Sequence, residues 1–312
     1  MINASDILAA AQLLKNGGLV AFPTETVYGL GADATSDKAV ARIFAAKRRP
    51  QFNPLISHLP DAEAAFRLGQ FSKDAEKLAE QFWPGPLTLV VERRKHCPVS
   101  LLCSAGLSSI AIRVPNHPVA LDLLQAVGRP IAAPSANRSG RISPTTAAHV
   151  SASLGNDVDL LVDGGPCAVG VESTVVQLLD GHAILLRAGG ITREQVEAAL
   201  GQKLEAPPTS GAAFHSPGQL ESHYAPRAML RLNALSLKSG EQYLGFGPHD
   251  HGALSLSNTG DLQEAAANLF NMLHAIDDSS PEAIAVAPIP MTGLGEAIND
   301  RLQRAAAPRP KP

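Results

Sequence analysis

Polar side chains gather in a series of short clusters, most of them next to an apolar run. Residues 23–31, Pro-Thr-Glu-Thr-Val-Tyr-Gly-Leu-Gly, follow the apolar run Leu19 to Phe22. Two threonines and a glutamate after a buried strand place three hydrogen-bonding groups at the edge of a sheet, where α/β proteins commonly bind ligands. The same residues could instead cap a turn, and this cluster alone does not decide between the two interpretations.

The second cluster is cationic. Residues 47–49, Lys-Arg-Arg, end a predicted helix before Pro50, and Asn53 and His58 follow within a few residues. Three cations at the C-terminus of a helix could simply complement its dipole. Cations beside amide and imidazole groups suit a polyphosphate better than a solvated surface, so we expect this cluster to bind phosphates.

The remaining clusters add polar groups at the ends of other predicted strands. Arg113 lies in the apolar run Ser109 to Val114, where burial would be costly without an anion, although an edge position facing water is the alternative. Residues 133–140, Ala-Pro-Ser-Ala-Asn-Arg-Ser-Gly, are small enough to let a ligand approach the backbone. Residues 172–174, Glu-Ser-Thr, open a strand, and residues 186–189, Leu-Arg-Ala-Gly, close one.

No standard nucleotide, hydrolase or metal motif accompanies these clusters. The chain has no Gly-x-x-x-x-Gly-Lys-Ser/Thr, Gly-x-Gly-x-x-Gly, His-Glu-x-x-His or Gly-x-Ser-x-Gly pattern. Its 3 cysteines form no Cys-x-x-Cys pair, which argues against a zinc knuckle and for a reducing compartment. We find no residues with a metal-ligand spacing of their own.

Composition narrows the class of protein. A chain of 312 residues with 45% hydrophobic residues can form two domains of ordinary size. The net charge of −3 disfavours tight nucleic-acid binding, because dedicated binders usually carry a basic excess. No apolar run is long enough to span a bilayer, and the N-terminus predicts an amphipathic helix rather than a signal peptide. We therefore expect a cytoplasmic protein that does not enter a membrane.

Strands and helices alternate over residues 1–202. Strands are predicted at 19–22, 87–91, 109–114, 130–133, 173–179 and 183–186, with the last two forming a hairpin across Asp180-Gly181. Ser36 is a typical N-cap for a helix that precedes the cationic cluster. Further helices are predicted at 118–127 and, from a Thr192/Gln195 capping box, through residue 200.

Residues 203–227 break this pattern with prolines, serines and glycines, which predicts a linker. Alternation resumes over residues 228–312, with strands predicted at 229–232, 243–246, 253–256 and 283–287 and helices at 262–276 and 296–306. This order favours a small α/β domain with a mainly parallel sheet.

Together the clusters resemble, in order and spacing, the L-threonylcarbamoyladenylate synthase family, whose catalytic module is the YrdC-like domain. The matching runs between residues 7 and 200 are PTETVYGLG, KRRPQFNPLISH, SIAIRVP, APSANRSG, VESTVV and LLRAGG. Two further runs, HSPGQLESHYAP and GLGEAINDRLQRAA, resemble the longer, two-domain branch. The resemblance implies an open twisted mixed sheet with a positively charged concave pocket in residues 1–202, a linker or lid at 203–227 and a smaller Rossmann-like domain at 228–312.

The resemblance also implies a reaction. The amine of L-threonine and bicarbonate give a carbamate, whose carboxylate attacks the α-phosphate of ATP and releases diphosphate. The residues implied as catalytic are Lys47 and Arg49. Those implied on the threonine side are Thr26, His58, Arg113, Ser135 and Ser173. Those implied on the ATP side are Arg49, Asn53, Ser109, Asn137, Thr145 and Arg187.

Three linker residues, Ser216, His223 and Tyr224, are implied to close over the pocket, with an inert tether as the alternative. Mg²⁺ is expected to arrive with ATP, held by phosphate oxygens and water. The expected consumer of the product is a threonylcarbamoyl-transferase complex that acts on adenosine in tRNA. Two other functions stay open, namely an RNA-binding module and a carbamoyl-transfer maturation factor related to the YrdC-like domains of hydrogenase maturation.

Overall fold

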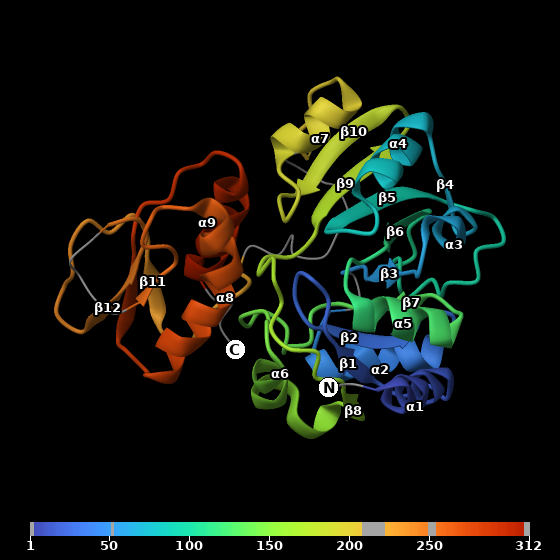
Figure 1. The fold of residues 1–312 in the computed structure, drawn as a ribbon, viewed down its shortest axis with the longest axis horizontal. Coiled ribbons are helices and arrows are strands. Elements are labelled where there is room, and N and C mark those ends of the chain that lie inside the picture. The colour runs from blue at the N-terminus through green and yellow to red at the C-terminus, as the bar shows by residue number, and fades with distance from the viewer. Residues whose placement is uncertain (1–2, 51–52, 208–221, 249–253, 309–312) are drawn as a thin grey trace.

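The structure is a computed structural model that describes residues 3–50, 53–207, 222–248 and 254–308 (Figure 1). A 10-stranded sheet occupies the larger part of the chain and a 4-stranded sheet the C-terminal part. The strands of the large sheet are β1 (Val20–Phe22), β2 (Gly29–Asp33), β3 (Ile56–His58), β4 (Gly69–Gln70), β5 (Leu87–Arg93), β6 (Ser109–Arg113), β7 (Ile131–Ala132), β8 (Leu160–Leu161), β9 (Thr174–Leu179) and β10 (His182–Arg187). The helices around it are α1 (Ala4–Lys15), α2 (Asp37–Lys47), α3 (Ala62–Phe66), α4 (Lys73–Phe82), α5 (Pro118–Val127), α6 (Ala147–Leu154) and α7 (Arg193–Leu200), with a 3₁₀ turn at Gly155–Asp157.

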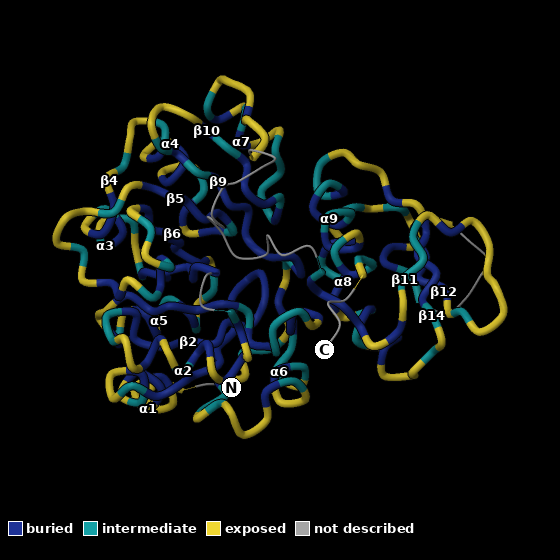
Figure 2. The backbone as a smooth tube through the Cα atoms, turned by 180° about the vertical axis from the view of Figure 1, so that it is seen from behind, coloured by how far each residue is buried: buried dark blue, intermediate teal, exposed yellow. Residues whose placement is uncertain are grey.

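The large sheet is mixed, in the order β10-β9-β5-β6-β3-β7-β2-β1-β8, with β4 on β5. The sheet combines parallel pairs, such as β3 with β6 and β5 with β9, with antiparallel ones, such as β5 with β6 and β3 with β7. Strands β2, β5, β6 and β9 are buried along most of their length (Figure 2). The prediction of an α/β fold with an open mixed sheet is therefore confirmed.

Helices cover both faces of this sheet at β1, which explains why that strand is apolar at successive positions. In β1, Val20 and Phe22 pack into a cluster with α1 and α5, whereas Ala21 packs into a second cluster with α2, α4 and α7. Both clusters are fully internal, so the strand ends are fixed on two sides. The loops that follow the strands therefore begin at fixed positions.

Local signals place several elements where the sequence predicts them. The hydroxyl of Ser36 accepts from the amide of Ala39 and starts α2. Asp180 and Gly181 have φ of 53° and 79°, and two successive positive φ values are what a tight two-residue hairpin requires. Helix α5 covers the predicted residues 118–127.

Several elements have no counterpart in the predictions. Strand β2 reads Gly-Leu-Gly-Ala-Asp and is buried throughout, so its two glycines hide any alternation of side chains. Helix α4 starts at the cap Ser72 and buries only Ala75, Leu78 and Ala79. Helix α6 is short and buries only Val150 and Leu154.

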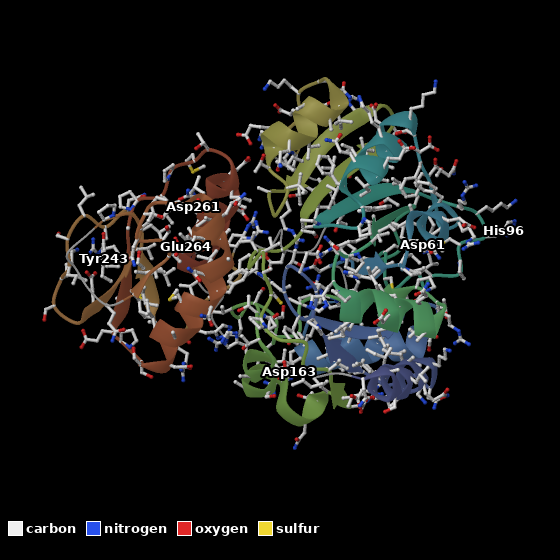
Figure 3. All side chains as sticks on the ribbon, in the orientation of Figure 1. Asp61, His96, Asp163, Tyr243, Asp261 and Glu264 are labelled. Carbon is white, nitrogen blue, oxygen red and sulfur yellow. The ribbon has the colours of Figure 1, made fainter. Side chains whose placement is uncertain are left out.

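The C-terminal sheet is parallel throughout and orders its strands β11 (Met229–Arg231), β14 (Ala283–Val286), β12 (Glu241–Gly245) and β13 (Leu254–Ser255). Helices α8 (Leu262–Asp278) and α9 (Leu294–Ala306) lie between this sheet and the large one (Figure 1). The side chain of Asp261 caps α8 by accepting from the amide of Glu264, and both residues are labelled in Figure 3. The prediction of a small, mainly parallel α/β unit is confirmed.

The main core of the C-terminal part extends into the large part. Val27, Ile142 and Val171 from the large part share one buried cluster with Leu269 and Phe270 of α8. At Gly170 an added Cβ would lie 2.3 Å from the carbonyl oxygen of Ala266 in α8, so the backbones themselves are in contact. The helices α8 and α9 therefore abut the loops that leave the large sheet. None of the described helices has the length and apolar character needed to cross a membrane.

Candidate active site

A pocket forms where strand ends and loops of the large sheet meet the end of the linker. Strands β3 and β6 run parallel, and their last residues, His58 and Arg113, are register partners. Arg187 ends β10, and Ser173 immediately precedes β9. The residues that line the pocket are Val27, Arg49, Ile56, His58, Arg113, Ala133, Pro134, Ser135, Glu172, Ser173, Arg187, His223 and Tyr224.

Four of the five residues expected on the threonine side line this pocket. His58 and Arg113 come from adjacent strand ends, Ser135 from the loop after β7, and Ser173 from the start of β9. Thr26 is fully buried, and its hydroxyl lies 2.9 Å from that of Thr24 instead of on the pocket wall. The structure therefore brings a guanidinium, an imidazole and two hydroxyls into one cavity.

The expected ATP side is partly on the wall and partly behind it. Arg49 and Arg187 line the pocket, whereas the other four expected residues are buried without lining it: Asn53, Ser109, Asn137 and Thr145. Nε and Nη2 of Arg187 donate to the carbonyl of Ser173 at 3.0 and 2.9 Å, which fixes the guanidinium beside that serine.

Unsatisfied polar atoms gather around this pocket. Within the described residues, neither side-chain amide atom of Asn53 has a hydrogen-bond partner, and neither does Oδ1 of Asn137 or Nδ1 of His223. Buried polar groups are normally paired, because leaving one unpaired costs roughly 1–3 kcal/mol. Such a concentration of unpaired atoms is typical of a site that takes a polar ligand.

Lys47 lies at the end of α2 with its ammonium directed at the loop after β7. Its Nζ lies 2.5 Å from the carbonyl oxygens of Ser135 and Asn137. Burial lowers the pKa of Lys47 well below its usual value, and the nearby guanidinium of Arg49 lowers it further. Arrival of an anion between these two cations would oppose both effects, because a negative charge favours the protonated lysine.

Burial also sets the charge of two other wall residues. It lowers the pKa of His58 to about 3, with a further contribution from Arg113, so the imidazole is neutral at physiological pH. It lowers the pKa of Arg49 to about 10, which still leaves the guanidinium charged. The pocket thus combines a neutral imidazole with charged arginines.

The end of the linker contributes two aromatic rings to the pocket wall. His223 and Tyr224 are 6% and 1% exposed, and their rings meet edge to face with centroids 4.1 Å apart. Tyr224 also stacks on Phe270 of α8, and its backbone has a left-handed φ of 63°. The cavity that remains has a volume of only about 40 Å³. Ser216, also predicted in the lid, lies outside the described residues.

Comparison with known proteins identifies the fold and its two parts. A family model for Sua5, YciO and YrdC proteins, described as "Telomere recombination", matches residues 12–189. A second model, "Threonylcarbamoyl-AMP synthase, C-terminal domain", matches residues 191–307. The chain belongs to the threonylcarbamoyl-AMP synthase family.

Relatives match over almost the whole chain. The threonylcarbamoyl-AMP synthase of Bacillus subtilis is 40% identical, over 98% of this chain and 94% of the relative. That of Pyrococcus abyssi is 39% identical, over 97% of this chain and 94% of the relative. The crystal structure of P. abyssi Sua5 complexed with L-threonine superimposes with a TM-score of 0.90 at 37% identity, covering 98% of this chain and 95% of that one. A likeness to Thermococcus kodakarensis HypF, at 20% identity and a TM-score of 0.53, is one of fold alone.

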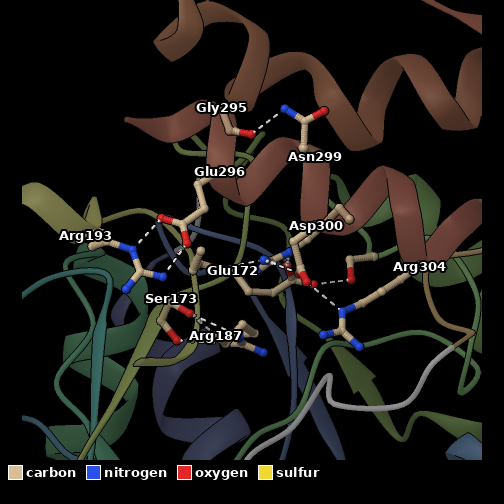
Figure 4. Close-up of polar contacts among 12 residues, drawn as sticks. Glu172, Ser173, Arg187, Arg193, Gly295, Glu296, Asn299, Asp300 and Arg304 are labelled. Atoms are coloured by element: carbon tan, nitrogen blue, oxygen red, sulfur yellow. Dashed lines mark hydrogen bonds and ion pairs between the residues drawn. The ribbon is translucent and has the colours of Figure 1, made fainter. Parts of the chain in front are cut away.

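The predicted site lacks two charged residues, Glu172 on the pocket wall and its partner Arg301. Glu172 lines the cavity, and both its oxygens accept hydrogen bonds, at 2.6 Å from the hydroxyl of Ser143 and at 3.0 Å from Nε of Arg301 in α9. Arg301 is fully buried, and Figure 4 shows how α9 lies over Glu172, Ser173 and Arg187. Burial would raise the pKa of Glu172, but Arg301 and Arg187 bring it below its usual value.

A signal for Arg301 is present in the sequence. Ala297, Ile298, Leu302 and Ala305 form the buried stripe of α9, and Arg301 occupies a position on that stripe. An arginine in the apolar stripe of an amphipathic helix predicts a buried partner of opposite charge. Glu172 has a weaker signal, because a glutamate before a strand is also compatible with an exposed turn.

Proposed function

We propose that this chain makes threonylcarbamoyl-AMP and diphosphate from L-threonine, bicarbonate and ATP, for N6-threonylcarbamoyladenosine in tRNA. The convergence of Arg49, Arg113 and Arg187 with His58 in one cavity carries this proposal. Three guanidiniums suit a carboxylate and a set of phosphates, and a neutral imidazole can bond a hydroxyl without adding charge. The P. abyssi relative, which was crystallised with L-threonine, supports the choice of amino acid.

The chemistry needs positioning and charge neutralisation, not a covalent enzyme intermediate. The threonine nitrogen forms a bond to the bicarbonate carbon, and one oxygen leaves as water. An oxygen of the resulting carbamate attacks the α-phosphorus of ATP, and the bond to the β-phosphate oxygen breaks to release diphosphate. Arg49 and Lys47 offset charge on the phosphates during this step, because preorganised cations cost no reorganisation at the moment of reaction.

The other proposed contacts divide the pocket in two. Arg113 pairs with the threonine carboxylate through its two-pronged guanidinium, close to Thr26, His58, Ser135 and Ser173. The nucleotide lies near Arg187, and the contacts proposed behind it are Asn53, Ser109, Asn137 and Thr145. The unpaired amide atoms of Asn53 and Asn137 support this arrangement, since a nucleotide would supply their missing partners.

Mg²⁺ is proposed to enter with ATP. Within the described residues no group of three or more His, Cys, Asp or Glu side chains could hold a metal ion. We propose that phosphate oxygens and water provide most of its ligands, as is usual for Mg²⁺ with nucleotides. The metal would neutralise phosphate charge, and Arg49 and Lys47 would act on the same phosphates.

The linker end is proposed to act as a lid. A cavity of about 40 Å³ is far smaller than the usual ligand pocket of roughly 300–1,000 Å³, so His223 and Tyr224 must withdraw before ATP enters. Their return excludes water from the mixed anhydride, which water would hydrolyse. We assign residues 1–202 to the catalytic domain, 203–227 to the lid and 228–312 to the small domain. The proposed setting is the cytoplasm, with a downstream threonylcarbamoyl-transferase complex as consumer of the product.

Substrate dependence tests this function. Pyrophosphate release should require both L-threonine and bicarbonate, and mass spectrometry should detect threonylcarbamoyl-AMP only in the complete reaction. Equal release after either substrate is omitted would identify a plain ATPase instead. Binding of RNA without pyrophosphate release, in a salt titration on filters, would favour an RNA-binding module.

A further inference from the structure

A buried ion pair beside the pocket has unused hydrogen-bonding capacity. Oε2 of Glu25 lies 2.8 Å from Nη2 of Arg113, and the two side chains are 9% and 5% exposed. Within the described chain, neither carboxylate oxygen of Glu25 forms a hydrogen bond, and neither does Nη2 of Arg113. An ionised carboxylate can accept about four hydrogen bonds. The pair is therefore buried with its polar atoms poorly satisfied, which is an unfavourable arrangement for a purely structural ion pair.

The second buried glutamate of this region makes a useful contrast. Both oxygens of Glu172 accept hydrogen bonds, from Ser143 at 2.6 Å and from Arg301 at 3.0 Å. Glu172 thus has a hydrogen-bond donor on each oxygen. Among the described residues, Glu25 has its ion pair with Arg113 and no hydrogen bond, so it is the carboxylate with more capacity to take a new donor.

The position of the pair connects it to the amino-acid side of the pocket. Arg113 lines the cavity, and its Nε donates to the carbonyl of Gly85 at 3.3 Å. The backbone carbonyl of Glu25 accepts from the amide of Val169 at 2.8 Å, which fixes the loop after β1. Glu25 also directly precedes Thr26, one of the residues proposed for the threonine side. The cation and the anion are thus held by different elements around one location.

A free α-amino acid carries a carboxylate and an ammonium on the same carbon atom at neutral pH. We propose that the Glu25–Arg113 pair is the empty form of a zwitterion site, in which the carboxylate of the amino-acid substrate pairs with Arg113 and its α-ammonium pairs with Glu25. This inference rests on the proposed function in one respect, the binding of threonine at Arg113. In this role Glu25 determines the specificity for an α-amino acid. It also positions the substrate nitrogen that must react with bicarbonate.

Two ligands separate this role from a structural one. 3-Hydroxybutanoate keeps the carboxylate and hydroxyl of threonine but lacks the ammonium. Calorimetry on the wild-type protein should show L-threonine binding at least about tenfold more tightly than 3-hydroxybutanoate, since a charge-assisted hydrogen bond is worth roughly ten- to a hundredfold in affinity. Equal affinities would overturn the proposal without any variant.

The Glu25→Gln variant keeps the shape of the side chain and removes its charge. Its affinity for L-threonine should fall about ten- to a hundredfold, whereas its affinity for 3-hydroxybutanoate should stay the same or rise, because Arg113 loses a competing carboxylate. A matched control is Asp33→Asn, at a carboxylate that is 2% exposed, pairs with Arg129 and lines a different cleft. That control should bind both ligands as the wild type does.

Other outcomes are equally informative. If Glu25→Gln weakens both ligands by the same factor, Glu25 only holds Arg113 in place and the zwitterion site is refuted. If Arg113→Met leaves threonine affinity unchanged, threonine binds elsewhere and the proposed function of Arg113 fails instead. Loss of threonine binding in Arg113→Met together with unaltered ligand discrimination in Glu25→Gln would refute only the role of Glu25.

Discussion

Replacing Arg301 by methionine should destabilise the protein strongly, although this residue belongs to the C-terminal part of the chain. Arg301 has no exposed surface, and Nε donates to Glu172 at 3.0 Å while Nη1 donates to the carbonyl of Ala188 at 2.6 Å. Methionine fills much of the same volume but leaves the buried carboxylate of Glu172 without its counter-ion. Removing one partner of a buried pair costs about 3–5 kcal/mol, and we expect a loss in that range.

The loss should depend on pH in a defined direction. In the wild type the pKa of Glu172 lies below its usual value, so its contribution to stability is present at neutral pH and is lost as the pH falls through the folded-state pKa. In Arg301→Met that pKa rises, because burial then outweighs the remaining cations. Protonation relieves the buried charge at a higher pH, so the difference between variant and wild type should shrink in mild acid.

Urea unfolding, followed by circular dichroism and by the fluorescence of Trp83, measures these differences. The control is Arg193→Met, which breaks another contact between the large part and α9: Arg193 bonds Glu296 at 2.6 and 3.1 Å, but the side chains are 33% and 25% exposed. Partly exposed pairs contribute at most about 1 kcal/mol. Figure 4 shows the contact of Arg193 with Glu296 and the position of Glu172 below α9.

A double-mutant cycle decides the cause. Glu172→Gln combined with Arg301→Met removes both charges, so the double variant should lose less stability than the two single losses added together. The reasoning is refuted if Arg301→Met costs no more than Arg193→Met, or if the double variant loses the full sum.

Further predictions concern the phosphate site, the imidazole and the packing of α8. Arg49→Ala should weaken ATP binding about ten- to a hundredfold in calorimetry. Arg48→Ala should leave ATP affinity unchanged, because Arg48 is exposed. Equal effects of the two substitutions would show that the phosphates do not bind at Arg49. His58, with a pKa of about 3, resists protonation in the folded state, so stability should fall as the pH drops from 6.5 towards 3, and His58→Gln should flatten that slope in urea titrations. Gly170→Ala should lower the melting temperature more than Gly201→Ala. Both glycines have a φ of 75°, but of the two only Gly170 lies against α8. An equal decrease would contradict the close packing of Gly170 on α8.

Much of this architecture is predictable from sequence because local signals agree with the tertiary structure. The Asp180-Gly181 turn, the Thr192 capping box and the apolar runs of β5 and β6 each specify one element. The missed elements lack such signals: β2 contains two glycines and α6 buries only two residues of its own. Tertiary contacts with neighbouring elements determine the structure of these two elements, and a single sequence does not reveal such contacts.

The candidate site also contains residues that have a signal in the sequence and residues that have none. Arg113 was predictable because an arginine inside an apolar strand requires a partner, and the structure supplies Glu25 at 2.8 Å. The order of motifs predicts Asn53 and Asn137, and only the fold shows that both amide atoms of Asn53 and Oδ1 of Asn137 are buried without a hydrogen-bond partner among the described residues. The contribution of Arg301 was missed because its partner, Glu172, lies 129 positions away in the chain.

The left-handed backbone at Tyr224 has a consequence for the timing of the reaction cycle. A residue other than glycine in this conformation is strained by about 1–2 kcal/mol, and here the strain is offset by the stacking of the ring on Phe270 and by the cation of Arg301, 5.5 Å from the ring centroid. The position of Tyr224 is thus stabilised by its side chain and opposed by its main chain. In the proposed lid, competition for the tyrosine ring would remove the stabilising contacts, and relaxation of the backbone would then favour opening. The time that the labile product stays in the pocket would then depend on how readily Tyr224 leaves its packing.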